Sequence, residues 1–559
     1  MVYFSFMEIG VTILSMEDAW FCLAAERSAA VKRLKGGIAQ VIGGMLRSTF
    51  VSGPHTLHQS GVVLHLADGT STRLFAKLEM LLQDGDAHKR VFMMKGDSGH
   101  KFCMGCRNLY SVSSEITNDD GDDFFTCSLI YEEELDFATD DDVRGTVRRL
   151  AEYAATCSSE ELRLREQAAG FSNNPANLLL DPALDAILQP VTHFAHDWMH
   201  ALVVHGVWNT IMFRMLKALV DSGVAKAPED LCDYVALWTV PLRLGGAGAS
   251  ERLADTFSKS RWKSAKNAKY MKATASDALS LYNIVACYIF AVFMRANRCV
   301  PECTAYLFLA DVLDMLVASP RGNVTPAMLR AAIKKFLESC VRAGWRIFMH
   351  PKFHWLIHLY RELAHFKMLL SCWVHERKHK MVKRYSNDVR NTTSFEKTIL
   401  SEVTCHHLAE LECESKFDLS VRLISPVRAA GPKLISFLAS AFSIEGDNVV
   451  YTTSARARVS EFEVCRRQDV VLFLDPCTLK VQCGEVCFFA ACNDCAVALI
   501  SLWHFETSEV EQGTVTVRIA DDTVELFSAS DILVSCTYRR KADGRAQIIV
   551  PSSYRGRVG

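Results

Sequence analysis

The sequence predicts a mixed α/β segment, then a long all-α segment, and finally a small all-β segment. Strand and helix patterns alternate over about the first 100 residues, which is typical of an α/β core. A helical pattern with few glycines or prolines follows from about 141 to 364. Short alternating runs separated by turn residues then fill about 448 to 550, and this regular spacing predicts a small barrel-like domain.

The α/β segment is predicted from local patterns. Residues 2–6 are rich in β-formers, and 16–35 read as a helix with acidic residues in its first turn and basic residues near its end. Residues 61–66 read as a strand that meets a turn at Asp68-Gly69. An apolar run over 74–82, which fits a strand or a helix, comes next.

Three long stretches carry the helical prediction: 143–166, 184–219 and 326–344. The apolar run 278–294 is near the lower length limit for a membrane span, at roughly 17 residues. It contains several polar side chains, so we interpret it as a buried helix and expect no transmembrane segment. Residues 349–424 are helical and rich in histidine and basic residues, and a boundary lies near 425–433.

Composition limits the function classes. Among 559 residues there are 62 Lys and Arg against 64 Asp and Glu, a formal net charge of -2, which excludes a disordered polyelectrolyte but not a local nucleic-acid-binding patch. The N-terminus lacks the basic and apolar regions of a secretory signal. The 20 cysteines are therefore expected to be reduced, in the nucleus or cytoplasm of the cell and not in a secreted protein. The acidic stretch 117–142 is interpreted as a solvated loop and helix start.

Two motifs in the α/β segment suggest metal binding. Asp84 and Asp86 directly follow an apolar run, and carboxylates at the end of a strand can hold Mg²⁺ or Mn²⁺, although Asp-Gly-Asp is also a common turn. Cys103 and Cys106 form a Cys-x-x-Cys, which is half of a tetrahedral Zn²⁺ site. The other half is left open between Cys127 and a histidine far downstream, and buried reduced thiols are the alternative.

Asp197 and His200 are three residues apart on a predicted helix, so they can share a hydrogen bond or a ligand, or form a purely structural pair. Further along, Glu376 stands in a basic, histidine-rich helix. Cations there could grip phosphates while the acid holds a metal, and an exposed charged helix is the alternative. The expected DNA contacts are Arg377, Lys378, Lys380, Lys383, Arg384 and Arg390.

Four cysteines in the β-rich segment have spacings that permit zinc. Phenylalanine and alanine lie between them on an apparent strand, which favours alternating core thiols over a metal site. They are Cys483, Cys487, Cys492 and Cys495.

Taken together, four segments resemble the transposase-like reading frames of the CACTA/Plavaka group, which are DDE transposases with an RNase H-like catalytic fold. The segments are LLQDGDAHKRVFMMKGDSGHKFCMGC, HDWMHALVVHG, FMHPKFHWLIHLYRELAHFKMLLSCWVHERKHKMVKR and SNDVRNTTSFEKTILSE. The resemblance covers roughly residues 1–410 and leaves out the β-rich segment, whose pattern is only weakly similar to small chromatin- or nucleic-acid-associated barrels.

The resemblance implies roles for individual residues. Asp84 would be the second catalytic aspartate, with Asp86 as the fallback, and Glu376 would be the final carboxylate. Asp197 and His200 would fill the family's Asp-x-x-His signature, and the Cys-x-x-Cys would bind zinc. The implied domains are a truncated RNase H-like segment at 1–130, a helical insertion at 131–345, a helical segment with the final Glu at 346–430, and a β-rich domain at 431–559.

The sequence also departs from the family. The first catalytic Asp of these enzymes lies upstream of a segment that here begins at Met1, and no Asp precedes Asp18. We therefore expect a transposase-derived protein whose ancestral reaction was metal-dependent DNA cleavage and strand transfer, with little activity left. DNA is the expected partner, with a second copy of the chain as a further option. The alternatives are a DNA- or chromatin-binding protein without catalysis and a decayed element without selected function.

Overall fold

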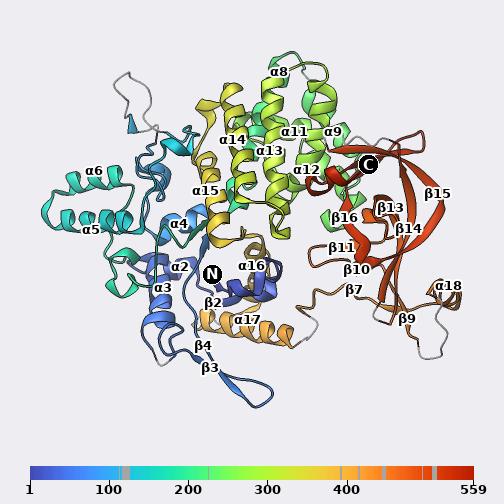
Figure 1. The fold of residues 1–559 in the computed structure, drawn as a ribbon. Coiled ribbons are helices and arrows are strands. Elements are labelled where there is room, and N and C mark those ends of the chain that lie inside the picture. The colour runs from blue at the N-terminus through green and yellow to red at the C-terminus, as the bar shows by residue number, and fades with distance from the viewer. Residues whose placement is uncertain are drawn as a thin grey trace. The chain divides into compact units, whose positions relative to one another are not determined.

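The computed structural model describes residues 1–53, 55–111, 114–115, 126–224, 226–390, 393–412, 416–442, 449–493, 495–506 and 513–558 (Figure 1). Contacts divide the chain into two compact units, each built from two separate stretches. Unit 1 combines Met1–Leu202 with Gly344–Cys413, and unit 2 combines Val203–Ala343 with Glu414–Gly559. The mixed α/β class with a C-terminal sheet region is confirmed. Positions 117–125 of the predicted acidic loop lie outside the described residues.

Two short parallel strands position the functional part of unit 1. β5 (Leu81–Gln83) pairs with β6 (Phe194–His196), with Gln83 opposite His196. Helix α4 (Gly85–Val91) follows β5, and helix α7 (Trp198–Leu202) follows β6. The carboxyl ends of parallel strands face the same edge of a sheet, so the residues that follow both strands share that edge.

The C-terminal stretch of unit 1 contributes three helices: α15 (Pro351–Phe366), α16 (Trp373–Asp388) and α17 (Phe395–Leu411). Helix α15 packs against β6 and α7, while α16 and α17 pack against one another. Segments about 150 residues or more apart in sequence therefore meet at the ends of β5 and β6.

The remaining elements of unit 1 surround this region, and a hydrophobic core containing Phe92, Leu179 and Leu188 lies beneath it. Strands β1 and β2 pair antiparallel, as do β3 and β4. The elements are β1 (Val2–Phe4), α1 (Gly10–Leu14), β2 (Phe21–Ala24), α2 (Ser28–Val31), α3 (Gly37–Leu46), β3 (Val62–His65), β4 (Ser71–Leu74), α5 (Asp140–Thr156) and α6 (Ser159–Ala169).

Two predicted helices are each interrupted by a strand. The helix expected over 16–35 is interrupted by β2 (Phe21–Ala24), which pairs with β1, and the one expected over 184–219 contains β6. In both cases pairing with another strand overrides a local helical pattern. The predicted helix 143–166 is instead two helices, because Ser158 caps the start of α6.

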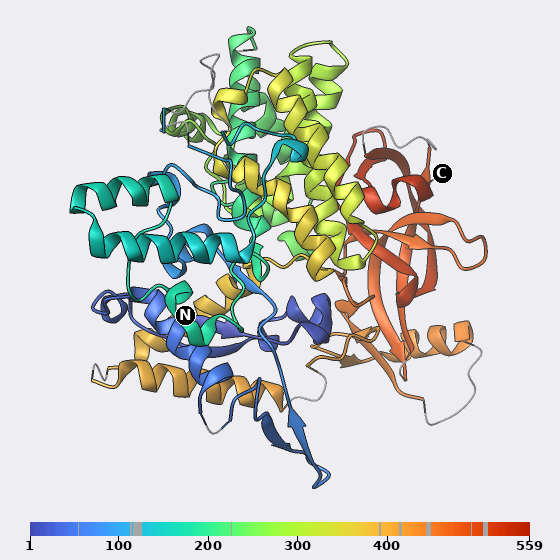
Figure 2. The ribbon, with the colours of Figure 1, turned by 60° about the vertical axis from the view of Figure 1, so that its left-hand side comes forward.

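Unit 2 begins with a helical layer in which α13 packs against α8, α12 and α14 (Figure 2). Two stretches, Ala275–Met294 and Val300–Arg321, are long and apolar enough to cross a membrane, but 67% and 56% of their most apolar windows are buried in the protein. This burial agrees with the buried helix expected over 278–294. The layer comprises α8 (Val207–Asp221), α9 (Ala227–Ala236), α10 (Ser250–Asp255), α11 (Lys259–Ala268), α12 (Ala275–Ile289), α13 (Val300–Ala318) and α14 (Pro326–Arg342).

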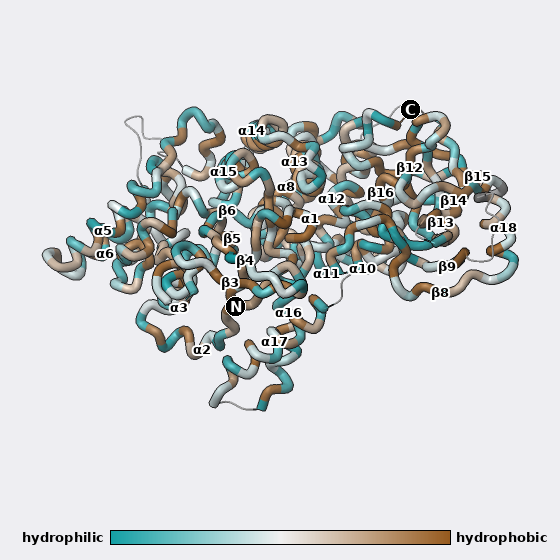
Figure 3. Tube along the Cα trace, turned by 60° about the horizontal axis from the view of Figure 1, so that its bottom comes forward, coloured by the Kyte–Doolittle hydropathy of each residue, from teal (hydrophilic) through white to brown (hydrophobic). Residues whose placement is uncertain are grey.

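The second stretch of unit 2 is β-rich, as predicted, with α18 (Pro432–Phe442) before most of its strands (Figure 3). Its main sheet runs in the order β16-β12-β13-β14-β15-β18-β17. Only Thr537 separates the first and last strands of this path, so the sheet curls until its edges approach. Its strands are β12 (Val470–Leu474), β13 (Val481–Cys492), β14 (Cys495–Phe505), β15 (Thr514–Ser528), β16 (Ile532–Cys536), β17 (Tyr538–Arg540) and β18 (Arg545–Ile549).

A smaller antiparallel sheet in unit 2 joins β7 (Arg422–Leu423), β10 (Arg456–Arg458) and β11 (Val464–Arg466). Strands β8 (Arg428–Ala429) and β9 (Tyr451–Ser454) join the main sheet through β13.

Candidate functional site: a Cys/His centre beside a carboxylate edge

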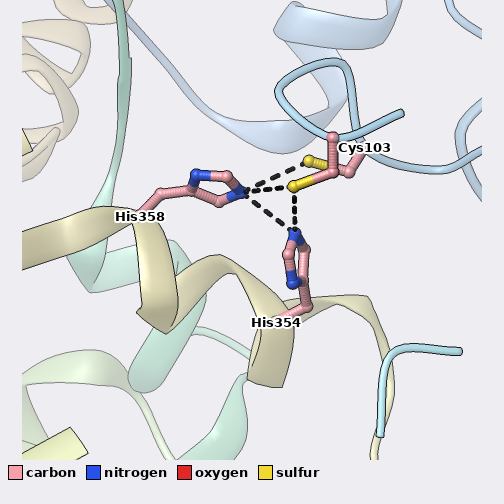
Figure 4. Close-up of side chains that lie close together, drawn as sticks. Cys103, His354 and His358 are labelled. Carbon is pink, nitrogen blue, oxygen red and sulfur yellow. Dashed lines mark hydrogen bonds between the residues drawn. The ribbon is translucent and has the colours of Figure 1, made fainter. Parts of the chain in front are cut away.

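Four buried side chains of unit 1 converge on one point (Figure 4). Cys103 and Cys106 lie on the loop after α4, and His354 and His358 are one turn apart on α15. The Cys103 sulfur lies 3.4 Å from Nε2 of His358, and the Cys106 sulfur lies 3.5 Å from Nε2 of His354. The two Nε2 atoms are 2.9 Å apart. We call this group the Cys/His centre.

The donor set fits zinc. A tetrahedral ion with two thiolates and two imidazoles has metal–ligand distances of about 2.0–2.3 Å, so its ligand atoms are separated by roughly 3–4 Å. The four donor atoms all lie within 4.8 Å of one another. The centre can therefore hold an ion such as Zn²⁺, with every ligand supplied by the protein.

Local electrostatics prepare the Cys/His centre for a cation. A hydrogen bond with Cys106 lowers the pKa of the Cys103 thiol well below its usual range, and the two nearby imidazoles lower it further. Burial lowers the pKa of His354, which keeps that imidazole neutral. A thiolate beside a neutral imidazole is the protonation state that metal coordination requires.

The loop approaches α15 closely because Gly105 separates the two cysteines. A Cβ atom at this position would lie 3.2 Å from Cε1 of His358, tighter than most real contacts. Glycine therefore lets the thiols reach the imidazoles.

A buried pair connects the Cys/His centre with strand β6. The ring of His196 stacks on His358 with centroids 4.9 Å apart, and Nδ1 of His196 shares a 2.5 Å hydrogen bond with Glu362. Burial raises the pKa of Glu362 to about 8 and lowers the pKa of His196 to about 4. Both side chains are therefore mainly uncharged near pH 7, which suits their buried position. His196 directly precedes Asp197.

The second group of polar side chains lies at the ends of β5 and β6. Asp84 follows β5 and caps α4 by accepting a hydrogen bond from the Ala87 amide at 2.7 Å. Asp197 follows β6, is only 4% exposed, and accepts a 3.0 Å hydrogen bond from the Met199 amide. Because Gln83 and His196 are register partners, the two aspartates occupy equivalent positions at one sheet edge.

Glu376, in the first turn of α16, is close to the same edge. Burial raises the pKa of the Cys372 thiol, and the carboxylates of Asp197, Asp84 and Glu376 raise it further. Of the three acids, Asp197 also hydrogen-bonds this thiol. We call Asp84, Asp197 and Glu376 the carboxylate edge.

His200, on α7, belongs to the same group. Its Nδ1 atom hydrogen-bonds Asp197, as the three-residue spacing predicted. Burial lowers the pKa of His200, but the hydrogen bond and charge of Asp197 outweigh burial and raise it overall. The pair is therefore confirmed as a contact.

A cavity of about 360 Å³ adjoins both groups. Its wall includes aromatic side chains, Cys103 and His358 of the Cys/His centre, and Asp197 of the carboxylate edge. The lining residues also include His200, Trp355 and Glu362.

Two predicted site residues are placed elsewhere. The side chain of Asp86 is 72% exposed and pairs with Arg90 at 2.9 Å, so this fallback ligand is directed to solvent. Lys378 is 2% exposed and donates hydrogen bonds to the carbonyl oxygens of Glu17, at 2.9 Å, and Trp20. Its amine therefore anchors the N-terminal segment and does not reach solvent to contact phosphate.

The other predicted DNA contacts lie on the surface of unit 1. Arg377 is exposed but is engaged with Glu17 at 2.8 Å. Lys380, Lys383, Arg384 and Arg390 are exposed.

Sequence reasoning missed the second half of the Cys/His centre. The sequence suggested Cys127 and an unspecified histidine. The thiol of Cys127 instead donates a hydrogen bond to the Met349 carbonyl at 3.0 Å. The His354-x-x-x-His358 spacing was the available signal, since residues four apart share a helix face. Cys372 had no such signal. In the β-rich stretch, the thiols of Cys483 and Cys492 are buried, as the core-thiol interpretation predicted, whereas Cys487 is partly exposed and Cys495 is exposed.

Comparisons with known proteins add no identification. No protein-family model matches the chain, and neither a curated protein nor a solved structure matches it.

Proposed function

We propose that the chain is a transposase-derived, DNA-acting protein, and that unit 1 corresponds to the RNase H-like catalytic part of such an enzyme. One observation carries the proposal: Asp84 and Asp197 follow adjacent parallel strands, and Glu376 joins them from a distant helix. Crevices at the carboxyl ends of parallel strands are common ligand sites in α/β proteins.

The carboxylate edge would bind Mg²⁺ or Mn²⁺, because hard divalent ions prefer oxygen ligands. Such ions, when bound, stabilise the charge that develops on phosphate oxygens during phosphodiester cleavage. The chain's own residues would act around them. Asp84 and Glu376 supply the ligands, Asp197 adds negative charge and orients His200, and exposed Lys380 and Lys383 on α16 attract the DNA backbone.

The Cys/His centre supports this function by positioning the edge. It fixes the loop with Cys103 and Cys106 to α15, and α15 packs against β6. His196, which directly precedes Asp197, is held in place by its contacts with His358 and Glu362. A change in the centre should therefore reach the carboxylate edge through these contacts.

A metal-binding measurement tests the proposal directly, because we expect strand cleavage by this chain to be weak. Mn²⁺ affinity of the zinc-loaded protein is compared for wild type, Asp84→Asn, Glu376→Gln and the control Asp86→Asn, whose carboxylate faces solvent. We expect the first two variants to lose at least about tenfold in affinity and the control to match wild type. Equal Mn²⁺ binding in all four proteins would contradict the proposal.

Plasmid nicking is the second readout. Any Mg²⁺- or Mn²⁺-dependent nicking should disappear in Glu376→Gln and persist in Asp86→Asn. Strong nicking by wild type that requires Glu376 would overturn our expectation of weak activity while supporting the site.

A specific observation in unit 2 favours a second candidate function, DNA binding without catalysis. In the sheet β7–β10–β11, Arg456 lies opposite Arg466, and Arg458 lies opposite Arg422. Directly opposite residues, and residues two apart on a strand, share a face. Four guanidinium groups therefore share one face of this sheet, while Ala457 is buried beneath it.

Within the part of the chain that the structure describes, only one of the four arginines forms an ion pair. Arg422 pairs with Asp418, whereas burial and the charge of Arg422 lower the pKa of Arg458. A cluster of guanidinium groups is well suited to phosphate oxygens. We infer that this face contacts the DNA backbone.

Salt dependence separates the two candidates. The slope of log K against log [salt] should be about -0.9 per phosphate contacted, so the double variant Arg456→Gln/Arg466→Gln should make it shallower by about 2 units. Arg545→Gln is the control, because that side chain already pairs with Glu506 at 3.3 Å. An unchanged slope in the double variant would exclude the arginine face as a DNA contact.

A DNA-acting protein would work in the nucleus.

A further inference from the structure

A second group of potential metal ligands shares Asp197 with the carboxylate edge. One donor atom each from Asp197, His200 and Cys372 lies within 4.8 Å of the others. The three residues come from different elements: the end of β6, helix α7, and the residue that precedes α16.

We propose that Asp197, His200 and Cys372 form a second metal site, which binds a transition-metal ion such as Zn²⁺ or Co²⁺ in preference to Mg²⁺. The inference concerns ion binding alone and does not depend on the DNA-cleaving function proposed above.

The donor set sets the metal preference. A carboxylate oxygen, an imidazole nitrogen and a thiolate sulfur suit zinc and cobalt, whereas Mg²⁺ prefers oxygen ligands and retains water. The sulfur of Cys372 is thus the atom that distinguishes this site from an all-carboxylate magnesium site.

The contacts now present are those that an ion would replace. Asp197 hydrogen-bonds Nδ1 of His200 and also the thiol of Cys372. On binding, the ion takes the place of the two protons between these atoms. The Cys372 S–H bond and the His200 Nδ1–H bond both break, the thiol proton leaves to solvent, and the Nδ1 proton also leaves to solvent while Nε2 of the imidazole keeps or takes up a proton, so that a neutral imidazole coordinates the ion. The product is a metal–thiolate with no change in oxidation state.

Burial and access differ around the three ligands. Asp197 is 4% exposed and Cys372 is 8% exposed, while the side chain of His200 is 20% exposed. Asp197 and His200 also line the 360 Å³ cavity. Three protein ligands next to a cavity leave a position for water or a substrate atom, the usual arrangement of reactive zinc sites.

The surrounding charge favours a cation. Asp84 and Glu376 act electrostatically on the Cys372 thiol, so an ion bound there would be near two further carboxylates. Negative charge from neighbouring groups raises affinity for a divalent ion without adding ligands.

Metal counting under anaerobic conditions tests the inference with the full chain. After saturation with Zn²⁺ and removal of loosely bound ions, we expect two zinc ions per wild-type chain, one in Cys372→Ser and one in His200→Gln. Cys405→Ser is the matched control, an exposed cysteine of the same unit, and it should retain two. Circular dichroism checks that each variant is folded.

Cobalt supplies an independent readout. Co²⁺ bound to thiolate gives a sulfur-to-metal charge-transfer band, and we expect Cys372→Ser to lose one increment of this band while the Cys/His centre keeps its own. The affinity for the second ion should fall more than about 100-fold, since loss of a direct ligand exceeds the 10–100-fold effect of an outer partner.

Two results would overturn the proposal: a wild-type chain that binds one ion, or a folded Cys372→Ser variant that still binds two. If Cys372→Ser fails to fold, His200→Gln decides in the same way. Absence of Mg²⁺-dependent nicking leaves these counts unchanged, so failure of the proposed function is distinguishable from failure of this inference.

Discussion

The Cys/His centre and the carboxylate edge are neighbours in unit 1, but their ligand sets differ in kind. The centre has four buried ligands and no need of an external one. The edge combines a buried Asp197 with a Glu376 side chain that is 53% exposed, and it adjoins a cavity. Closed four-ligand sites hold structure, and sites with an open position perform chemistry. The contrast therefore assigns stability to one group and reactivity to the other.

The largest effect is expected when a ligand of the Cys/His centre is removed. His354→Ala removes one of four ligands, and metal binding in such sites contributes on the order of 10 kcal/mol to folding. We expect unit 1 to lose its cooperative unfolding transition in calorimetry, and chelation of wild-type protein to do the same. Cys405→Ser, whose thiol is exposed, should melt like wild type. A chelated protein with an unchanged transition would refute the structural role of the centre.

The next largest effect is expected for Lys378, which anchors the helix that carries Glu376. Lys378→Met leaves the carbonyl oxygens of Glu17 and Trp20 without their donor, and each lost buried partner costs roughly 1–3 kcal/mol. We expect a loss of about 3 kcal/mol in the free energy of unfolding by urea denaturation. Lys380→Met, on the exposed side of α16, should change it by less than about 0.5 kcal/mol. Equal losses would mean that the two lysines do not differ in role.

A smaller effect sharpens the geometry of the centre. Gly105→Ala would place a methyl group 3.2 Å from Cε1 of His358, so the ring must move by a few tenths of an ångström. We expect a zinc affinity several-fold lower in a chelator competition, a change of about 1 kcal/mol. Gly44→Ala is the control, because nothing lies within 4 Å of its added Cβ. An unchanged zinc affinity in Gly105→Ala would show that the loop can move without weakening metal binding.

The smallest effect on stability is expected for a substitution in the carboxylate edge. Glu376→Gln alters a half-exposed side chain, so the free energy of unfolding should change by less than about 0.5 kcal/mol even though Mn²⁺ affinity falls. Thermal melting in the absence of Mn²⁺ provides the measurement. A large destabilisation would indicate that Glu376 supports the fold instead of chemistry.

Most residues of the candidate site could be predicted from the sequence, but the contacts that join them could not. Asp84, Glu376, the Asp197–His200 pair and the Cys-x-x-Cys were named from spacing and resemblance. Lys378 was misassigned because a repeating pattern of charge does not show which side of a helix is buried. Two strands were missed for a related reason: Phe21–Ala24 and Phe194–His196 are short and become strands by pairing with partners outside the local pattern.

The sequence by itself determined the order of α/β, helical and β-rich segments, because hydrophobic periodicity and turn residues are local properties. It also determined which chemistry-bearing residues exist. Only the tertiary structure decided that Cys103 and Cys106 face His354 and His358, and that Cys372 joins Asp197 and His200. These contacts span up to about 250 residues of chain, and local pattern cannot specify them because they form when separate elements bury their apolar faces together.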